Sequence, residues 1–195
     1  MGWEYFGKPW AEAKRGATFR QLPMLVTEEG TGIAQTGAIM RYLARRLGLV
    51  PADPLTAALV DEVFEGAHEL FAHFNPVVNF HTGDQFRASK EACLPVLHNR
   101  FADFELLLAR HDGPFFFGES PYYCDFAAFH HIDLAHFIDE AILADYPRLQ
   151  GFMAGMRGLP GVSAYLAERP ELIGVGVGPK LVIDGMPVPT GITAD

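Results

Sequence analysis

Residues 21–49, QLPMLVTEEGTGIAQTGAIMRYLARRLGL, decide the fold of this chain. Gln21–Val26 has the composition of a short strand, and the acidic, glycine-containing stretch Thr27–Gly32 is typical of a turn. Ile33-Ala34 follows as a short return strand. The apolar residues of the next stretch recur at the spacing of a helix, which we predict over Thr36–Leu47. Gly48 then supplies a stop signal.

A polar pair, Gln35 and Thr36, stands where this predicted helix begins. The first turn of a helix has free backbone N–H groups, and the helix dipole favours negative charge there. A carboxylate is therefore a suitable ligand for the pair. The alternative is that the two residues only cap the helix.

Composition limits the classes of function. The chain has 195 residues, 49% hydrophobic, which is enough for one large domain or two small ones. Its formal net charge of -9 argues against a nucleic-acid partner, because phosphates require a basic surface. No apolar run reaches the length of about 18 residues that a membrane span needs, so we predict none.

The two cysteines, Cys93 and Cys124, show neither zinc-binding nor CxxC spacing. We predict buried free thiols in a reducing compartment, either the cytoplasm or the interior of an organelle.

The remainder of the chain is mostly helical by its periodicity. Predicted helices cover Leu55–Phe74, Ser89–His111, Asp125–Leu143, Tyr146–Met156 and Val162–Glu168. The tail from Pro170 is rich in Gly and Pro, and its segment Leu181–Val188 predicts a hairpin with an Asp-Gly turn. We therefore predict an α+β protein with three parts: 1–50, 54–169 and 170–195.

Histidine clusters in the helical part do not predict a metal site. His68 and His73 are five residues apart, whereas two ligands on one helical face require a spacing of four. A second group, His130, His131, Asp133 and His136, drifts around its helix instead of stacking. We predict a solvated or aromatic-packed face for this group.

Two motifs resemble the glutathione transferase family. Phe19–Leu25 (FRQLPML) is similar to the family pattern F-G-Q-L-P-x-L, and Gln35–Arg45 (QTGAIMRYLAR) is similar to Q-S-x-A-I-x-R-Y-L-A. Trp10 and Lys14 keep the Trp-x3-Lys spacing of the sigma-like classes. Phe116–Phe126 resembles the start of a helix in the family's helical domain. The resemblance covers about residues 8–170 and implies a thioredoxin-like α/β domain followed by an all-helical bundle.

The resemblance also implies a glutathione site. A cis-proline turn at Leu22-Pro23 exposes the backbone of Leu22, which can pair with an extended peptide as an added strand does. Gln35 and Thr36 then receive the γ-glutamyl group, and Trp10 and Lys14 the glycyl carboxylate. The full predicted set is Trp10, Lys14, Gln21, Leu22, Pro23, Gln35 and Thr36, with no metal ligand.

No catalytic residue is carried over from the family. Its catalytic Tyr, Ser or Cys belongs to a first strand, or the turn after it, that should precede Trp10 by some tens of residues, and this sequence has nine. Gly2–Phe6 aligns better with the family's second strand, so Tyr5 is not the catalytic Tyr. We expect an N-terminally truncated thioredoxin-like domain. The edge beside Gln21–Val26 is then covered by the tail hairpin, by a partner chain, by a contact among the remaining strands, or by a segment missing from the sequence.

The start of the predicted helix at Asp125 also departs from the family, which has Ser or Thr three residues earlier. Tyr122 occupies that position here and cannot cap through its side chain, although Ser120 offers an imperfect substitute.

These departures favour a non-catalytic scaffold or binding subunit of a larger assembly, with a protein partner or a homodimer. The alternative is an active transferase that conjugates or isomerises electrophiles with glutathione.

Overall fold

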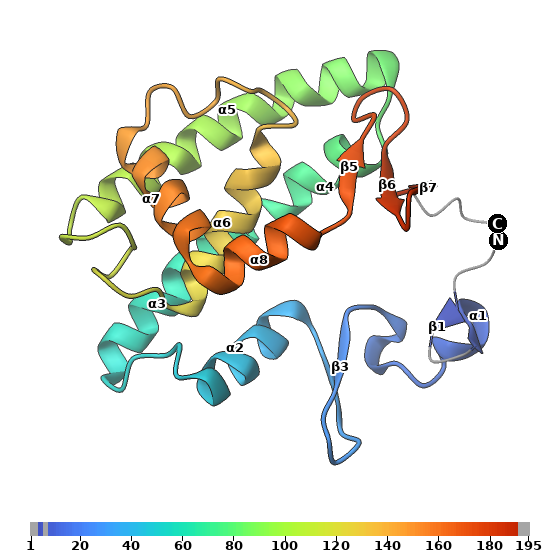
Figure 1. The fold of residues 1–195 in the computed structure, drawn as a ribbon, viewed down its shortest axis with the longest axis horizontal. Helices are drawn as coiled ribbons and strands as arrows, with labels where there is room; N and C mark the ends of the chain where they lie inside the picture. Colours follow the sequence, from blue (N-terminus) through green and yellow to red (C-terminus); the bar gives the residue numbers. More distant parts are fainter. Residues whose placement is uncertain (1–3, 6–7, 191–195) are drawn as a thin grey trace. The chain divides into compact units, whose positions relative to one another are not determined.

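The computed structural model describes residues 4–5 and 8–190 (Figure 1). The chain divides into two compact units, Met1–Pro51 and Ala52–Asp195. No helix in the described ranges has the length and apolar character of a membrane span.

The first unit is built from short elements. β1 (Glu4–Tyr5) and β2 (Lys8–Pro9) form one antiparallel pair and are followed by α1 (Trp10–Ala13) and the 3₁₀ turn η1 (Thr18–Arg20). The predicted strand Gly2–Phe6 is described only at Glu4–Tyr5, and its other residues lie outside the described ranges.

The decisive stretch folds as predicted into a hairpin and a helix. β3 (Met24–Val26) pairs antiparallel with β4 (Gly32–Ala34), and α2 spans Thr36–Leu47. Gly48 ends α2 in the left-handed conformation, φ 70°, and its N–H donates to the carbonyl of Ala44. The return strand and the helix with its stop at Gly48 are thus confirmed, whereas the strand predicted over Gln21–Val26 is confirmed only over Met24–Val26.

Six helices and a small sheet make up the described part of the second unit. The helices are α3 (Pro54–His68), α4 (Phe71–Asn79), α5 (Gly83–Leu108), α6 (Tyr123–Ala135), α7 (Pro147–Gly158) and α8 (Pro160–Glu168). Central α6 packs against α3, α4 and α7. Large aromatic side chains fill the core around it, and the largest fully buried ones are Phe64, Phe74, Phe101, Phe104, Phe116, Tyr123 and Phe152.

Three predicted helices differ from the structure. The helix expected over Ser89–His111 begins earlier, at Gly83, and ends at Leu108. The single helix expected over Leu55–Phe74 is divided at Glu69-Leu70, where the N–H of Leu70 donates to the carbonyl of Ala67, a tighter 3₁₀-type bond. The end predicted at Leu143 is wrong, because α6 ends at Ala135. Successive turns follow, and they keep the apolar residues Ile138, Ile142 and Leu143 buried without a helix.

The start of α6 is held by Asp125. Its buried carboxylate accepts the N–H of Tyr122 at 2.8 Å and the N–H of Phe116 at 3.0 Å. Tyr122 occupies the cap position, and its backbone carbonyl, not its side chain, accepts the N–H of Asp125. The helix therefore begins without a Ser or Thr cap because the carboxylate three residues inside it reaches back.

The tail forms a sheet of its own. β5 (Glu171–Ile173), β6 (Lys180–Ile183) and β7 (Met186–Pro189) are antiparallel, in the order β5-β6-β7. Asp184 and Gly185 join β6 to β7 with φ values of 51° and 75°, the left-handed pair that a tight hairpin turn requires. The predicted hairpin is confirmed, and its strand partner is β5.

Candidate glutathione-binding site

The register of the β3–β4 hairpin places the two predicted halves of the site together. Met24 lies opposite Ala34 at one end of the antiparallel pair. The residues that precede Met24 and those that follow Ala34 therefore emerge at the same end. Leu22 and Pro23 are thus brought close to Gln35 and Thr36, although twelve positions separate Pro23 from Gln35.

The peptide bond between Leu22 and Pro23 is cis, as predicted. Gln21, Leu22 and Pro23 are all exposed, and β3 begins immediately after them at Met24. The backbone of Leu22 therefore lies at the surface, outside the β3–β4 ladder. An exposed backbone segment outside a strand ladder can pair with a peptide, as an additional strand does.

Gln35 has an unusual backbone conformation. Its φ of 71° and ψ of 120° lie outside the regions that a residue with a side chain normally occupies. It stands at the N-cap of α2, yet its side chain makes no capping hydrogen bond. The alternative of a simple capping pair is therefore not supported at Gln35, and its exposed amide remains available for another group.

Thr36 begins α2 and is half-buried beside Gln35. The carbonyl of Gln35 accepts the N–H of Ile39, the first bond of the helix. The N–H groups of the first turn have no partner within the helix, and the helix dipole adds partial positive charge there. Together with the Thr36 hydroxyl, this helix start suits a carboxylate.

The remaining predicted residues belong to another segment of the same unit. Trp10 is the first residue of α1, and its side chain lies outside the described part of the structure. Lys14 follows α1 directly and is exposed. Their approach to the Gln35-Thr36 pair stays a prediction.

The described cysteine thiols are unsuited to nucleophilic chemistry. Cys93 and Cys124 are free and buried, as predicted. Burial raises the pKa of Cys93 to about 11, and burial together with the Asp125 carboxylate raises that of Cys124 well above its ordinary value. Both groups are therefore protonated thiols at neutral pH.

The histidine clusters hold no metal geometry. Among the described residues, no group of three or more His, Cys, Asp or Glu side chains is arranged for a metal ion. His131 packs against aromatic rings, and Asp133 is held by Arg157 and Arg169, each at 2.8 Å. Sequence reasoning anticipated aromatic packing of this face but missed the ion cluster, because its arginines come from distant segments.

Comparison with known proteins identifies the family. A family model for the "Glutathione S-transferase, C-terminal domain" matches residues 68–169. Glutathione S-transferase P 10 of Caenorhabditis elegans is 32% identical over 167 residues, which cover 85% of this chain and 77% of that protein. The chain belongs to the glutathione S-transferase family.

Solved structures of family members share the fold. The glutathione S-transferase from Ascaris lumbricoides superposes with a TM-score of 0.75 at 28% identity, covering 83% of this chain and 80% of that one. The Pi-class transferase of Onchocerca volvulus gives 0.73 at 26% identity, over 82% and 76% of the two chains. These likenesses confirm the predicted fold class, a thioredoxin-like α/β part followed by a helical part.

Proposed function

We propose that this chain binds glutathione where α2 begins. The backbone of Gln35 carries the proposal, because strained conformations at non-glycine residues gather at ligand sites, where the surrounding structure holds them in place. A γ-glutamyl carboxylate would accept hydrogen bonds from Thr36 and the first turn of α2. Gln35 would contact the same γ-glutamyl group.

The rest of the glutathione would lie along the end of the β3–β4 hairpin at which Met24 is opposite Ala34. Its cysteinyl segment would pair with the exposed backbone of Leu22, beside Gln21 and Pro23. Trp10 and Lys14 would receive the glycyl carboxylate, with Lys14 supplying a charge-assisted hydrogen bond. This arrangement uses all seven residues predicted from the sequence.

Conjugation is the first candidate for the chemistry. The names of the relatives, such as Glutathione S-transferase 1 of Ascaris suum at 28% identity, favour it. With a chlorinated nitrobenzene, the glutathione sulfur would form a bond to the ring carbon, chloride would leave, and the thiol proton would pass to solvent. No residue of this chain is assigned as the group that activates the thiol, and the sigma-like class stays part of the proposal.

A binding or scaffold subunit is the second candidate. Within the described residues, β3 is hydrogen-bonded to β4 alone, so its other edge is open there. Open strand edges invite pairing with another chain. This observation favours a homodimer or another protein partner for the first unit.

Calorimetric titration with glutathione tests the binding. We expect a saturable signal in the micromolar to millimolar range, weakened about tenfold in Thr36→Val, since one hydrogen bond to a charged group is lost. Thr31→Val is the matched control, because it removes a hydroxyl from the opposite end of the same hairpin. The absence of heat at millimolar glutathione, or equal weakening by both variants, would contradict the proposal.

Turnover separates the two candidates. Conjugation of 1-chloro-2,4-dinitrobenzene well above the uncatalysed rate supports the transferase. Glutathione binding without turnover, together with a stoichiometric partner that co-purifies with the chain, supports the binding subunit.

A further inference from the structure

A pocket of about 330 Å³ lies on the helical unit, between α7 and the segment that connects α6 to α7. Residues of this α6–α7 connection, residues 136–146, form one wall of the pocket, and residues of α7 form the other. Figure 1 shows the connection leading the chain from the end of α6 back to the start of α7. Pockets that hold small organic molecules usually measure roughly 300–1,000 Å³, so this one has room for a compact ligand.

Contacts within the protein hold the two walls together. The side-chain amide of Gln150 in α7 donates to the carbonyl of Leu143 at 2.7 Å and to the carbonyl of Ala144 at 3.3 Å. The carboxylate of Glu105 accepts two backbone N–H groups in the first turn of α7, at 2.8 and 3.0 Å. The connection and the helix are therefore joined without the help of a ligand.

The α7 wall carries a positive charge that the protein does not fully neutralise. Nη2 of Arg157 donates to one carboxylate oxygen of Asp133 at 2.8 Å, and Nη1 of Arg169 lies 2.8 Å from the other. Burial would raise the pKa of Asp133, but the bonds from the two arginines leave it lowered, so the carboxylate is ionised at neutral pH. Two guanidinium groups thus share one carboxylate, and one positive charge is left over.

Arg157 also has hydrogen-bonding capacity left over. Its side chain is 44% exposed, and Asp133 is its one hydrogen-bond partner among the described residues. A guanidinium has five N–H donors in a planar fork, and its geometry matches that of a carboxylate. The free N–H groups of Arg157 therefore suit a ligand carboxylate.

The opposite wall carries a carboxylate. Glu140 belongs to the α6–α7 connection, lines the pocket and is exposed, and within the described part of the chain it forms no ion pair, not even with Arg157. The side-chain oxygen of Gln150 is a further acceptor, because its hydrogen bonds use the amide nitrogen. Acceptors of this kind suit an ammonium group. Two opposite charges thus line one pocket without touching, which leaves room for a ligand that carries both.

The charge of the whole chain favours a ligand without net charge. The formal net charge is -9, so a free anion would approach against an unfavourable electrostatic field. A zwitterion avoids this cost, and it can still place a carboxylate at Arg157 and an ammonium group at Glu140.

Apolar residues complete the pocket. Leu143 and Met153 line it and are 6% and 1% exposed, and the exposed residues Ala141 and Ala144 line it as well. An apolar side chain of the ligand gains free energy when these residues remove it from water. The lining therefore combines an apolar surface with two opposite charges.

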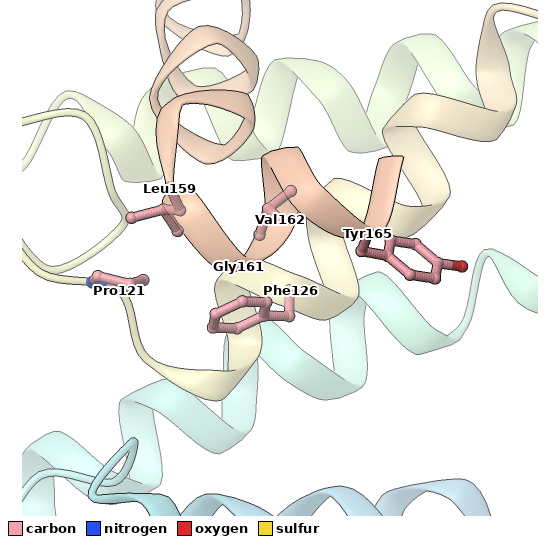
Figure 2. A pocket seen from close by; sticks show the side chains of 6 residues that line it. All are labelled: Pro121, Phe126, Leu159, Gly161, Val162 and Tyr165. Atoms are coloured by element: carbon pink, nitrogen blue, oxygen red, sulfur yellow. The ribbon is translucent and has the colours of Figure 1, made fainter. Parts of the chain in front are cut away.

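Another pocket of the helical unit shows the contrast. It measures about 440 Å³ and is lined by Pro121, Phe126, Leu159, Gly161, Val162 and Tyr165. Figure 2 shows the Tyr165 hydroxyl, the one polar side-chain group among them, directed away from the other five residues. That pocket has no charged group for a zwitterion, whereas the smaller pocket beside α7 has one of each sign.

We propose that the pocket between the α6–α7 connection and α7 binds a small zwitterion, an α-amino acid with an apolar side chain. The ligand carboxylate contacts Arg157, the ammonium group contacts Glu140, and the side chain lies against the apolar residues of the pocket. This site lies on the helical unit and does not depend on the proposed glutathione site.

Leucine, 4-methylpentanoate and 3-methylbutylamine test the site on the full-length chain. The last two keep the apolar skeleton of leucine, but the first of them lacks the ammonium group and the second lacks the carboxylate. We expect leucine to bind with a dissociation constant of about 1 mM, and each analogue to bind about tenfold more weakly, because one charge-assisted hydrogen bond is lost. Ligand-observed NMR titrations measure the three affinities.

Two variants assign the ends of the ligand. Arg157→Met should weaken both leucine and 4-methylpentanoate about tenfold, whereas Glu140→Gln should weaken leucine alone, since 4-methylpentanoate has no ammonium group. Arg148→Met, an exposed arginine of α7, and Asp145→Asn, an exposed carboxylate of the connection, are the matched controls outside the pocket and should leave leucine binding unchanged.

Glu140→Gln keeps the test valid if Arg157→Met does not fold, because the Glu140 side chain is exposed and holds no described residue in place. No saturable binding of leucine up to 10 mM, equal affinities for leucine and 4-methylpentanoate, or unchanged leucine binding in Glu140→Gln would overturn the proposal. Thr36→Val should not affect leucine, and a loss of leucine binding in that variant would overturn the proposal by placing the amino acid at the start of α2.

Discussion

The imidazole of His131 lies flat against the phenyl ring of Phe74, with the ring centroids 5.9 Å apart and the ring planes 8° apart. The contact joins α6 to α4 in the middle of the helical unit. It also excludes water from the imidazole, since His131 is 4% exposed. A histidine buried in this way folds in its neutral form, which makes the stability of the unit depend on pH.

We expect the free energy of unfolding to fall as pH drops below 6.5. Burial, with His130 and His68 nearby, lowers the His131 pKa from 6.5 to about 3 in the folded chain. Between these values the unfolded chain binds a proton that the folded chain does not, at a cost of up to about 1.4 kcal/mol per pH unit. Urea denaturation at pH 7.5, 6.5 and 5.5 measures the free energy of unfolding. In His131→Phe this free energy should fall less steeply with decreasing pH than in the wild-type chain.

His73→Phe is the matched control for this prediction, because it makes the same substitution at an exposed histidine of the same unit. Parallel pH dependence in the wild-type chain and in His131→Phe would contradict the assignment to His131.

Asp133 should stabilise the helical unit more than either of its partners. Its carboxylate accepts hydrogen bonds from Arg157 and is paired with Arg169. We expect Asp133→Asn to cost about 1–3 kcal/mol, because it weakens both pairs, and Arg157→Met or Arg169→Met to cost less. Denaturant unfolding of the three single variants and of the double arginine variant measures the coupling.

The contribution of Asp133 should also depend on pH. Burial alone would raise the Asp133 pKa, but the bonds from Arg157 and Arg169 outweigh it and leave the pKa lowered. The stabilisation is therefore present above about pH 4 and lost as pH falls through the folded-state pKa. If the wild-type chain and Asp133→Asn differed equally at pH 7 and at the lowest accessible pH, this account would be wrong.

Asp125 should be the critical residue at the start of α6. Its carboxylate accepts two backbone N–H groups, those of Phe116 and Tyr122. Asp125→Ala leaves both without an acceptor, and we expect a loss of about 2–6 kcal/mol, since each buried unsatisfied group costs about 1–3 kcal/mol. Asp125→Asn keeps one acceptor oxygen and should lose less. Thermal and urea unfolding measure the loss of stability in the two variants. Equal losses in Asp125→Ala and Asp125→Asn would exclude the hydrogen bonds to the Asp125 carboxylate as the cause.

At position 35 we expect the usual order of stability, in which an alanine variant is more stable than a glycine variant, to be reversed. At ordinary helix positions glycine is about 0.5–1 kcal/mol less stable than alanine. At a φ of 71° a Cβ atom is strained, so we expect Gln35→Gly to be more stable than Gln35→Ala. Exposed Ala38, inside α2, supplies the reference, since Ala38→Gly should show the usual loss.

The same two Gln35 variants connect strain to ligand binding. Both lack the amide side chain, and under the proposed function both should bind glutathione more weakly than the wild-type chain. A Gln35→Gly chain that is no more stable than Gln35→Ala would show that the backbone of Gln35 stores no strain.

Local signals were enough for much of the fold. Strand composition and turn residues determined the β3–β4 hairpin, helical spacing with Gly48 determined α2, and Asp184-Gly185 determined the β6–β7 turn. The strength of these signals comes from backbone conformation, which neighbouring residues largely decide. The family motifs around Gln21–Pro23 and Gln35-Thr36 likewise lie within one short stretch.

Other features could not be predicted in this way. Neither the end of α6 at Ala135 nor the division at Glu69-Leu70 has a Gly or Pro signal beside it. The positive φ of Gln35 was also missed, because Gly, Asn and Asp are the residues that normally adopt it.

The sequence by itself thus determined the α+β architecture, the family, and the stretch proposed to hold glutathione. Only the tertiary structure decided the surroundings of His131, the pairing of Asp133 with Arg157 and Arg169, and the pocket between the α6–α7 connection and α7. The physical reason is the separation along the chain between the residues that interact. Turn and helix signals act over a few residues, whereas burial, ion pairing and cavity shape depend on segments that are distant in the chain and meet only when it folds.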